Sequence, residues 1–445
     1  MPSLHVPNEL LDQIFDLIHD KSAEPTRELA SLALAATRLG TSERFSLRIN
    51  PVCVAESQQT FASLARTSKL FLPLARSYLY HRPIFPSSSV SWNKAISLVN
   101  SISSPLGQLV VSLDGIADFV LALETLHRPI VDLPFKLQGY SAVFSFYYKV
   151  FEGSPHLSSV EIIADSMRHL NKLLKALTRQ QPTLKAVKFG NRAQDSHHIS
   201  EQRVLRALQS KQLQTIENLV LENVDQGQPQ YIFEGPSIPL SVKSFSLISS
   251  IRDMFLSRLT ALFPKDPSSL RQISIEIDDP SLDCHKWILR CVPPTLTDIS
   301  FTGLEEAEYG YFRPELEDYL ESELPSLSGL TFRRFSSLAT LSLHNFHGPS
   351  INLLKSLTTS SPLLSHLDFS KCRWESSSPG PITISNDTIY GIVDPDELKA
   401  ALLKMGNLKK IHLGVLPTEL RGTHESLEEL KEKKGIDVEW DIWDS

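Results

Sequence analysis

A short apolar phrase recurs along most of this 445-residue chain. Each copy holds an apolar residue, two variable residues, a second apolar residue, one variable residue and a third apolar residue. Seven of the ten gaps between successive starts are 24 to 28 residues long. That length matches a repeat of one strand, one turn and one helix. The copies begin at Leu106, Ile130, Leu157, Leu184, Ile216, Val242, Leu270, Leu296, Leu338, Leu364 and Leu408, of which the first two are the weakest.

The period predicts an α/β solenoid with a curved parallel sheet and helices on its convex side. One such unit cannot bury a core alone, so the units must stack. Helical patterns lie between copies, at 166–180 and at 394–405, where Asp394 and Pro395 suit an N-cap and a first turn. Over roughly 100–445 the sequence resembles leucine-rich-repeat proteins in a degenerate form. The Asn or Cys that usually follows the phrase occurs once, as Cys372.

The N-terminal part has a different pattern. Residues 6–18, VPNELLDQIFDLI, carry two adjacent apolar stripes, which is more apolar surface than a one-sided surface helix presents. Residues 61–85 place leucines among arginines and end in Leu79-Tyr80. Together the two segments resemble an F-box, of the kind found in fungal F-box proteins with degenerate leucine-rich repeats. That resemblance implies docking to a Skp-type adaptor, which links to a cullin, through Pro7, Leu10, Leu11, Ile14, Phe15 and Leu64.

The resemblance departs from the family in its spacing, because residues 19–60 separate the two segments. Within them, 29–39 also resembles the second helix of the box, so either 29–39 or 61–80 completes it, and Leu79-Tyr80 favours the latter. We therefore expect an F-box-like helical module over 1–85 with an insertion at about 19–60, and a solenoid over 86–445. The alternative is a helical cap on the first repeat, which terminal repeats require.

Composition excludes several classes of protein. The formal charge is −7, whereas binding to nucleic acid or to anionic membranes needs a basic surface. The first residues lack the pattern of a secretory signal, and no apolar stretch is long enough to span a membrane. Four cysteines do not form a disulfide framework. We expect a protein of the cytoplasm or nucleus that binds neither nucleic acid nor membrane.

Catalytic motifs for phosphate, dinucleotide, acyl-transfer and zinc-protease chemistry are absent from the sequence. Cys284, His285 and Cys291 do not have the ligand number or spacing of structural zinc. The sequence therefore predicts no enzyme activity, no metal and no cofactor.

The residue between the last two apolar positions of each phrase should face the concave side. Four successive copies carry serine there, which gives an uncharged surface: Ser246, Ser274, Ser300 and Ser342. Near the C-terminal end, histidines and an aspartate fall on consecutive strands: His344, His366, Asp368 and His412. They predict either a ligand pocket or an ordinary solvated polar face.

Two gaps are longer than the period, and insertions on rigid scaffolds often carry recognition. The first insertion, 304–323, is acidic with interleaved aromatics, and the second, 373–392, is rich in Ser and Pro. The alternative is a solvated acidic helix and a Ser/Pro loop. We expect substrate contacts in this half of the chain, at Tyr311, Asp368, Trp374 and His412.

These observations favour a substrate-receptor subunit of a cullin-type (SCF) ubiquitin ligase, with the repeats binding an unknown substrate protein. The alternative is a leucine-rich-repeat scaffold for protein interactions, with a helical cap and no ubiquitin role. Adaptor binding distinguishes the two.

Overall fold

The structure is a computed structural model with two compact units, one that includes Arg44–Asp225 (unit 1) and one that includes Gln226–Ser445 (unit 2). Each unit is described by itself. The described residues, with gaps in some ranges, are 62–80, 97–113, 142–164, 172–177, 184–191, 201–209, 215–222, 237–248, 262–263, 269–277, 284–303, 327–346, 349–374, 395–416 and 430–442.

Unit 1 alternates helices with short parallel strands. Its strands pair in chain order, and the register aligns Leu113 with Val160, Val160 with Val187, and Val187 with Leu219. Its elements are η1 (Pro105–Leu109), β1 (Ser112–Leu113), α6 (Ala142–Gly153), β2 (Ser159–Ala164), β3 (Ala186–Asn191), α8 (Glu201–Leu208) and β4 (Asn218–Glu222).

Unit 2 continues the same alternation. Every strand from β5 to β10 pairs in parallel with the next strand along the chain. Its elements are β5 (Ser244–Ile248), β6 (Gln272–Ile277), α10 (Cys284–Cys291), β7 (Asp298–Gly303), β8 (Thr340–His344), α11 (Ile351–Ser360), β9 (His366–Asp368), α12 (Pro395–Lys404), β10 (Lys410–Leu416) and β11 (Asp437–Ile442).

The nine clear copies of the phrase all coincide with strands, β2 to β10. In the copy that forms β8, Leu338, Leu341 and Leu343 are fully buried. Full burial of a leucine side chain stabilises a fold by about 1.5–3 kcal/mol, so each phrase contributes three strong apolar anchors. The predicted α/β class and the parallel repeat are confirmed.

Backbone hydrogen bonds repeat with the same period. In unit 2, the carbonyl just before each of the strands β5 to β9 accepts two N–H bonds from the next repeat. Thr297, for example, accepts from Ala339 at 2.8 Å and from Thr340 at 3.0 Å. Ala339 then accepts from Ser365 and His366 at 2.9 and 3.0 Å. This staircase of carbonyls fixes the register of one repeat on the next.

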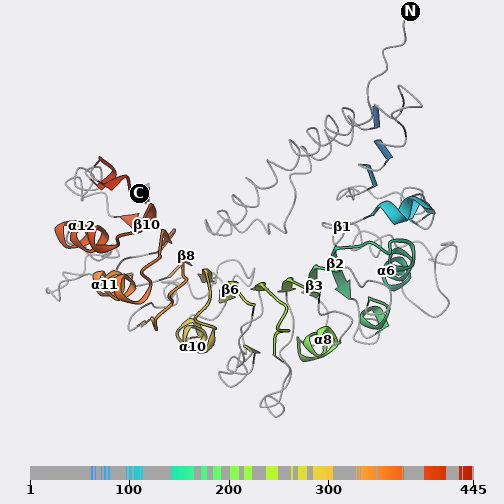
Figure 1. Ribbon diagram of the computed structural model, residues 1–445, viewed down its shortest axis with the longest axis horizontal. Helices are drawn as coiled ribbons and strands as arrows, with labels where there is room; N and C mark the ends of the chain where they lie inside the picture. The colour runs from blue at the N-terminus through green and yellow to red at the C-terminus, as the bar shows by residue number, and fades with distance from the viewer. Residues whose placement is uncertain are drawn as a thin grey trace, which may run out of the picture. The chain divides into compact units, whose positions relative to one another are not determined.

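The connecting helices cover one side of the strands within each unit (Figure 1), α6 and α8 in unit 1 and α10, α11 and α12 in unit 2. The expected start of α12 at Pro395 is confirmed. Helix α11 begins after Ser350, whose hydroxyl accepts the N–H of Leu353 at 3.3 Å. Its Leu353, Leu354 and Leu357 are buried. The opposite side of the strands is therefore the polar one.

One sequence prediction about strands is wrong, and one strand was not predicted. The weak copy that begins at Leu106 lies mostly in the 3-10 helix η1, and the strand β1 starts only at Ser112. The last strand, β11, carries no phrase and was not predicted. Its sequence, DVEWDI, alternates acidic and apolar residues, which is the period of a half-buried strand.

The predicted helical module at 1–85 lies outside the described residues, apart from single helical positions between 62 and 80. Its boundary with the repeats at residue 85 stays a prediction. The weak copy at Ile130 and the insertion 304–323 also lie outside the described residues.

Candidate functional site

In unit 2, seven polar side chains stand directly beside one another in the register of the sheet. We call them the polar row. They lie on the face away from the helices, because the residues that flank them in each strand, such as Leu341 and Leu343, are in the core. The polar row consists of Ser246, Ser274, Ser300, Ser342, Asp368, His412 and Glu439.

The sequence identified this row up to His412. Glu439 was missed because β11 lacks the phrase, although the pairing of His412 with Glu439 extends the row by one strand. Hydroxyl groups both donate and accept hydrogen bonds, whereas a carboxylate only accepts them. The row thus changes along its length from neutral hydroxyls to ionisable groups.

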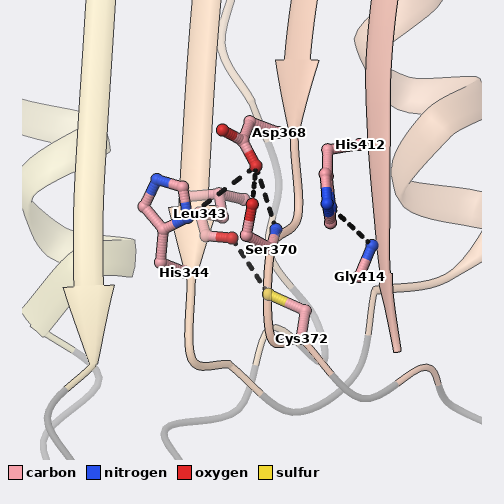
Figure 2. A network of polar contacts seen from close by, with 7 residues as sticks. All are labelled: Leu343, His344, Asp368, Ser370, Cys372, His412 and Gly414. Atoms are coloured by element: carbon pink, nitrogen blue, oxygen red, sulfur yellow. Dashed lines mark hydrogen bonds and ion pairs between the residues drawn. The ribbon is translucent and has the colours of Figure 1, made fainter. Parts of the chain in front are cut away.

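Asp368 is held in place by its neighbours (Figure 2). Its Oδ1 accepts the backbone N–H of Ser370 at 3.0 Å and also the Ser370 hydroxyl. The Nδ1 of His344, which is fully buried, lies 3.8 Å from the same oxygen. About 17% of the Asp368 side chain is exposed. Contacts inside the protein orient the carboxylate, and the exposed part of the side chain is accessible to solvent.

Ser342 lies directly beside Asp368, because the two residues are paired in the register. Only 1% of Ser342 is exposed, and its hydroxyl has no hydrogen-bond partner among the described residues. A buried hydroxyl without a partner is destabilising by about 1–3 kcal/mol. No imidazole bonds to this oxygen, so the Ser, His and Asp here do not form a nucleophile–base pair of the kind that serine hydrolases use.

His412 has a defined tautomer. Its Nδ1 accepts the backbone N–H of Gly414 at 3.2 Å, so in the neutral ring the proton sits on Nε2. Gly414 has φ +77°, and an added Cβ would lie 2.3 Å from the carbonyl oxygen of Phe369. Only glycine fits this close approach. The expectation that Asp368 and His412 share one face of the sheet is confirmed.

The expectation that Trp374 contacts a substrate is wrong, because the side chain is buried. Only 2% of Trp374 is exposed, its ring packs edge-on against Phe369 at 5.6 Å, and its indole N–H donates to the carbonyl of Leu413. The N–H is the one polar group of the indole, and it finds its hydrogen-bond acceptor inside the protein. The remaining ring atoms are part of the apolar core. Trp374 therefore anchors the start of the insertion and cannot serve as an exposed contact for a partner.

The other predicted site residues lie outside the described residues. They are Pro7, Leu10, Leu11, Ile14, Phe15 and Leu64 of the expected adaptor surface, and Tyr311 of the expected substrate surface.

The same face of unit 1 carries charged rather than neutral side chains. Lys188 Nζ lies 2.8 Å from Glu161 Oε1 and 2.9 Å from Glu222 Oε2, so one ammonium bridges three strands. The Tyr147 hydroxyl donates to the backbone carbonyl of Glu161 at 3.0 Å. Glu161 and Lys188 occupy the position between the last two apolar residues of their phrases, whereas Glu222 stands two residues beyond that position in β4.

Electrostatics explain the protonation state of Lys188. Burial favours the neutral amine and would lower the pKa, but Glu161 and Glu222 more than offset it, so the pKa is raised above 10.5. Lys188 therefore stays charged at neutral pH. The group formed by Lys188, Glu161 and Glu222 carries a net charge of −1, and the ammonium of Lys188 is paired with both carboxylates within the group.

Metal and membrane sites receive no support from the described part of the chain. Among the described residues, no three His, Cys, Asp or Glu side chains gather closely enough to hold a metal ion. Cys284 and Cys291 are the two ends of α10, an ordinary helix as expected. In the same part of the chain, no helix has the length and apolar character to cross a bilayer.

Comparisons with known proteins do not assign a family. No protein-family model matches the chain, and no curated protein matches it. One solved structure, the crystal structure of the Rad7 and Elc1 complex in yeast, aligns with 91% of this chain and 94% of that chain. The TM-score is 0.35 and the sequence identity 14%. A TM-score of this size does not establish a shared fold.

Proposed function

We propose that the chain is a substrate-receptor subunit of a cullin-type ubiquitin ligase. Its N-terminal segment binds a Skp-type adaptor, and its repeats bind a substrate protein. The observation that supports substrate binding is the polar row, a line of hydrogen-bonding side chains on a rigid parallel sheet. Rigid scaffolds with polar faces suit the recognition of a polypeptide.

In this proposal the chain supplies binding and no catalytic residue or cofactor. The ligase acts through proximity, because holding substrate and enzyme together raises their effective concentration. The place of action is the cytoplasm or the nucleus.

The adaptor half of the proposal rests on the sequence alone. Leu11 and Phe15 are four residues apart in the sequence, which is the spacing of one helical turn, and both are among the residues that the F-box resemblance assigns to the adaptor surface. Removing two such anchors from an interface costs about 2 kcal/mol or more at each hot spot, which weakens binding by orders of magnitude.

The test is a pull-down of purified Skp-type adaptor and cullin by the full-length chain. We expect the wild type to retain both and the double variant Leu11→Ala/Phe15→Ala to lose both, with an unchanged unfolding temperature. The matched control is Leu240→Ala/Leu363→Ala, which removes two leucines of the repeats that are each 53% exposed. This control should bind like the wild type.

Single variants identify which segment completes the box. Leu64→Ala should weaken adaptor binding if residues 61–80 complete it, and Leu34→Ala should do so if 29–39 do. A wild type that never retains the adaptor would leave the repeat scaffold as the better hypothesis.

A further inference from the structure

We propose that unit 2 binds an arginine side chain of the substrate protein on the polar row, with Asp368 as the carboxylate partner and Ser342 as a second acceptor. This inference rests on the proposed role of the repeats in substrate binding, and it names the chemistry of the segment that they recognise.

The first argument is the preparation of Asp368 for a cation. Its Oδ1 is fixed by the N–H and the hydroxyl of Ser370, and His344 stands behind it at 3.8 Å. These contacts hold the carboxylate in one orientation while 17% of its side chain remains exposed. An oriented carboxylate is the preferred partner of a guanidinium, which binds with two parallel hydrogen bonds.

The second argument is the unused hydroxyl beside it. Ser342 is paired with Asp368 in the register, and its hydroxyl is buried without a hydrogen-bond partner. Side chains in register on neighbouring parallel strands stand about 4.8 Å apart. A guanidinium presents five N–H donors in a planar fork, so it can bond to both groups at once, whereas an ammonium acts as a single point charge.

A further buried polar group lies near this end of β8. Asn345 is 3% exposed, and its Oδ1 is buried without a hydrogen-bond partner. Its backbone N–H donates to the carbonyl of Ser370 at 3.3 Å, so Asn345 and the residue that orients Asp368 are neighbours. Asp368 and Ser342 both offer acceptor lone pairs, which a donor-only side chain such as arginine can use.

The test uses two fluorescein-labelled peptide libraries with random flanking residues. One has arginine fixed at the centre, and the other has citrulline, which keeps the shape and removes the charge. Binding to the full-length chain is followed by fluorescence anisotropy. We expect the arginine library to bind about 10- to 100-fold more tightly, the range for a charge-assisted hydrogen bond.

Three variants locate the effect. Asp368→Asn should reduce the arginine library to the level of the citrulline library. Ser342→Ala should weaken arginine binding about 3- to 10-fold. It should not lower the unfolding temperature, because the hydroxyl has no partner to lose. Asp298→Asn is the matched control, since it removes a carboxylate from the same face of β7 and should leave binding unchanged.

Equal binding of the two libraries would overturn the proposal. So would an equal loss in Asp298→Asn and Asp368→Asn, or full arginine binding by Ser342→Ala. Adaptor retention by Asp368→Asn separates this inference from the proposed function. If the wild type prefers arginine but never retains the adaptor, the site stands and the ligase role fails.

Discussion

The side of the strands that faces away from the helices has different chemistry in the two units. In unit 1, Lys188 sits between Glu161 and Glu222 and these charges satisfy one another. In unit 2, the corresponding row is made of serines, Asp368 and His412, and the Ser342 hydroxyl has no partner. One repeat architecture therefore carries a self-contained ion-pair network in one unit and a row with hydrogen-bonding capacity in the other. Repeats fix where a side chain points, and they leave its chemistry open.

The largest expected effect comes from breaking the network in unit 1. Lys188→Met leaves Glu161, whose side chain is 7% exposed, without its cation. We expect a loss of about 3–5 kcal/mol in the free energy of unfolding at pH 7, the range for an ion pair that loses one buried partner. Chemical denaturation measures it. The double variant Glu161→Gln/Lys188→Met should recover much of the loss, and a cost below about 1 kcal/mol for Lys188→Met would show that the network behaves as a surface pair.

The second effect is the response of unit 1 to alkali. The folded-state pKa of Lys188 is raised above 10.5, so folding favours the charged amine. The stabilisation is therefore fully present below pH 10.5, and it is lost as the pH rises through the folded-state pKa. Denaturation curves between pH 9 and 12 should show a fall in the free energy of unfolding that Lys188→Met lacks. Parallel curves for the two proteins would contradict the assignment.

The smallest effect is expected at an ion pair of the same residue types in unit 2. Lys410 Nζ lies 2.7 Å from Glu439 Oε1, but the two side chains are 44% and 46% exposed. Exposed pairs of this kind contribute about 0–1 kcal/mol, so Lys410→Met should change the free energy of unfolding by less than about 1 kcal/mol. An equal cost for Lys410→Met and Lys188→Met would remove the distinction between the two units.

The fold was predictable where burial repeats with one period. Leu341, Leu343 and their equivalents face the helices and must therefore be apolar. Each copy of the phrase has apolar residues at these positions. The strands β1 and β11 were misplaced or missed because neither carries a full phrase. In β11, Gly435 occupies the position where the first apolar residue of the phrase would stand, and only the alternation of acidic and apolar residues remains as a signal.

The candidate site was predictable only in its placement. The register brings Asp368 and His412 onto one face, as the spacing of the phrases predicted. The role of Trp374 was not predictable, because its burial depends on the Leu413 carbonyl and the Phe369 ring from distant parts of the chain. The contact between Lys188 and Glu222 was missed for a related reason, since it is diagonal across two strands and not along one register row.

The staircase of carbonyls has a consequence for biosynthesis. Within each unit the strands pair in chain order, so the partner of each new strand has already been made when that strand leaves the ribosome. A repeat such as the one that begins at Leu364 can dock on its predecessor without waiting for residues still to be translated. The order of synthesis is then also the order of assembly, and the newest strand of the growing sheet is an edge that stays unpaired until the next strand is made.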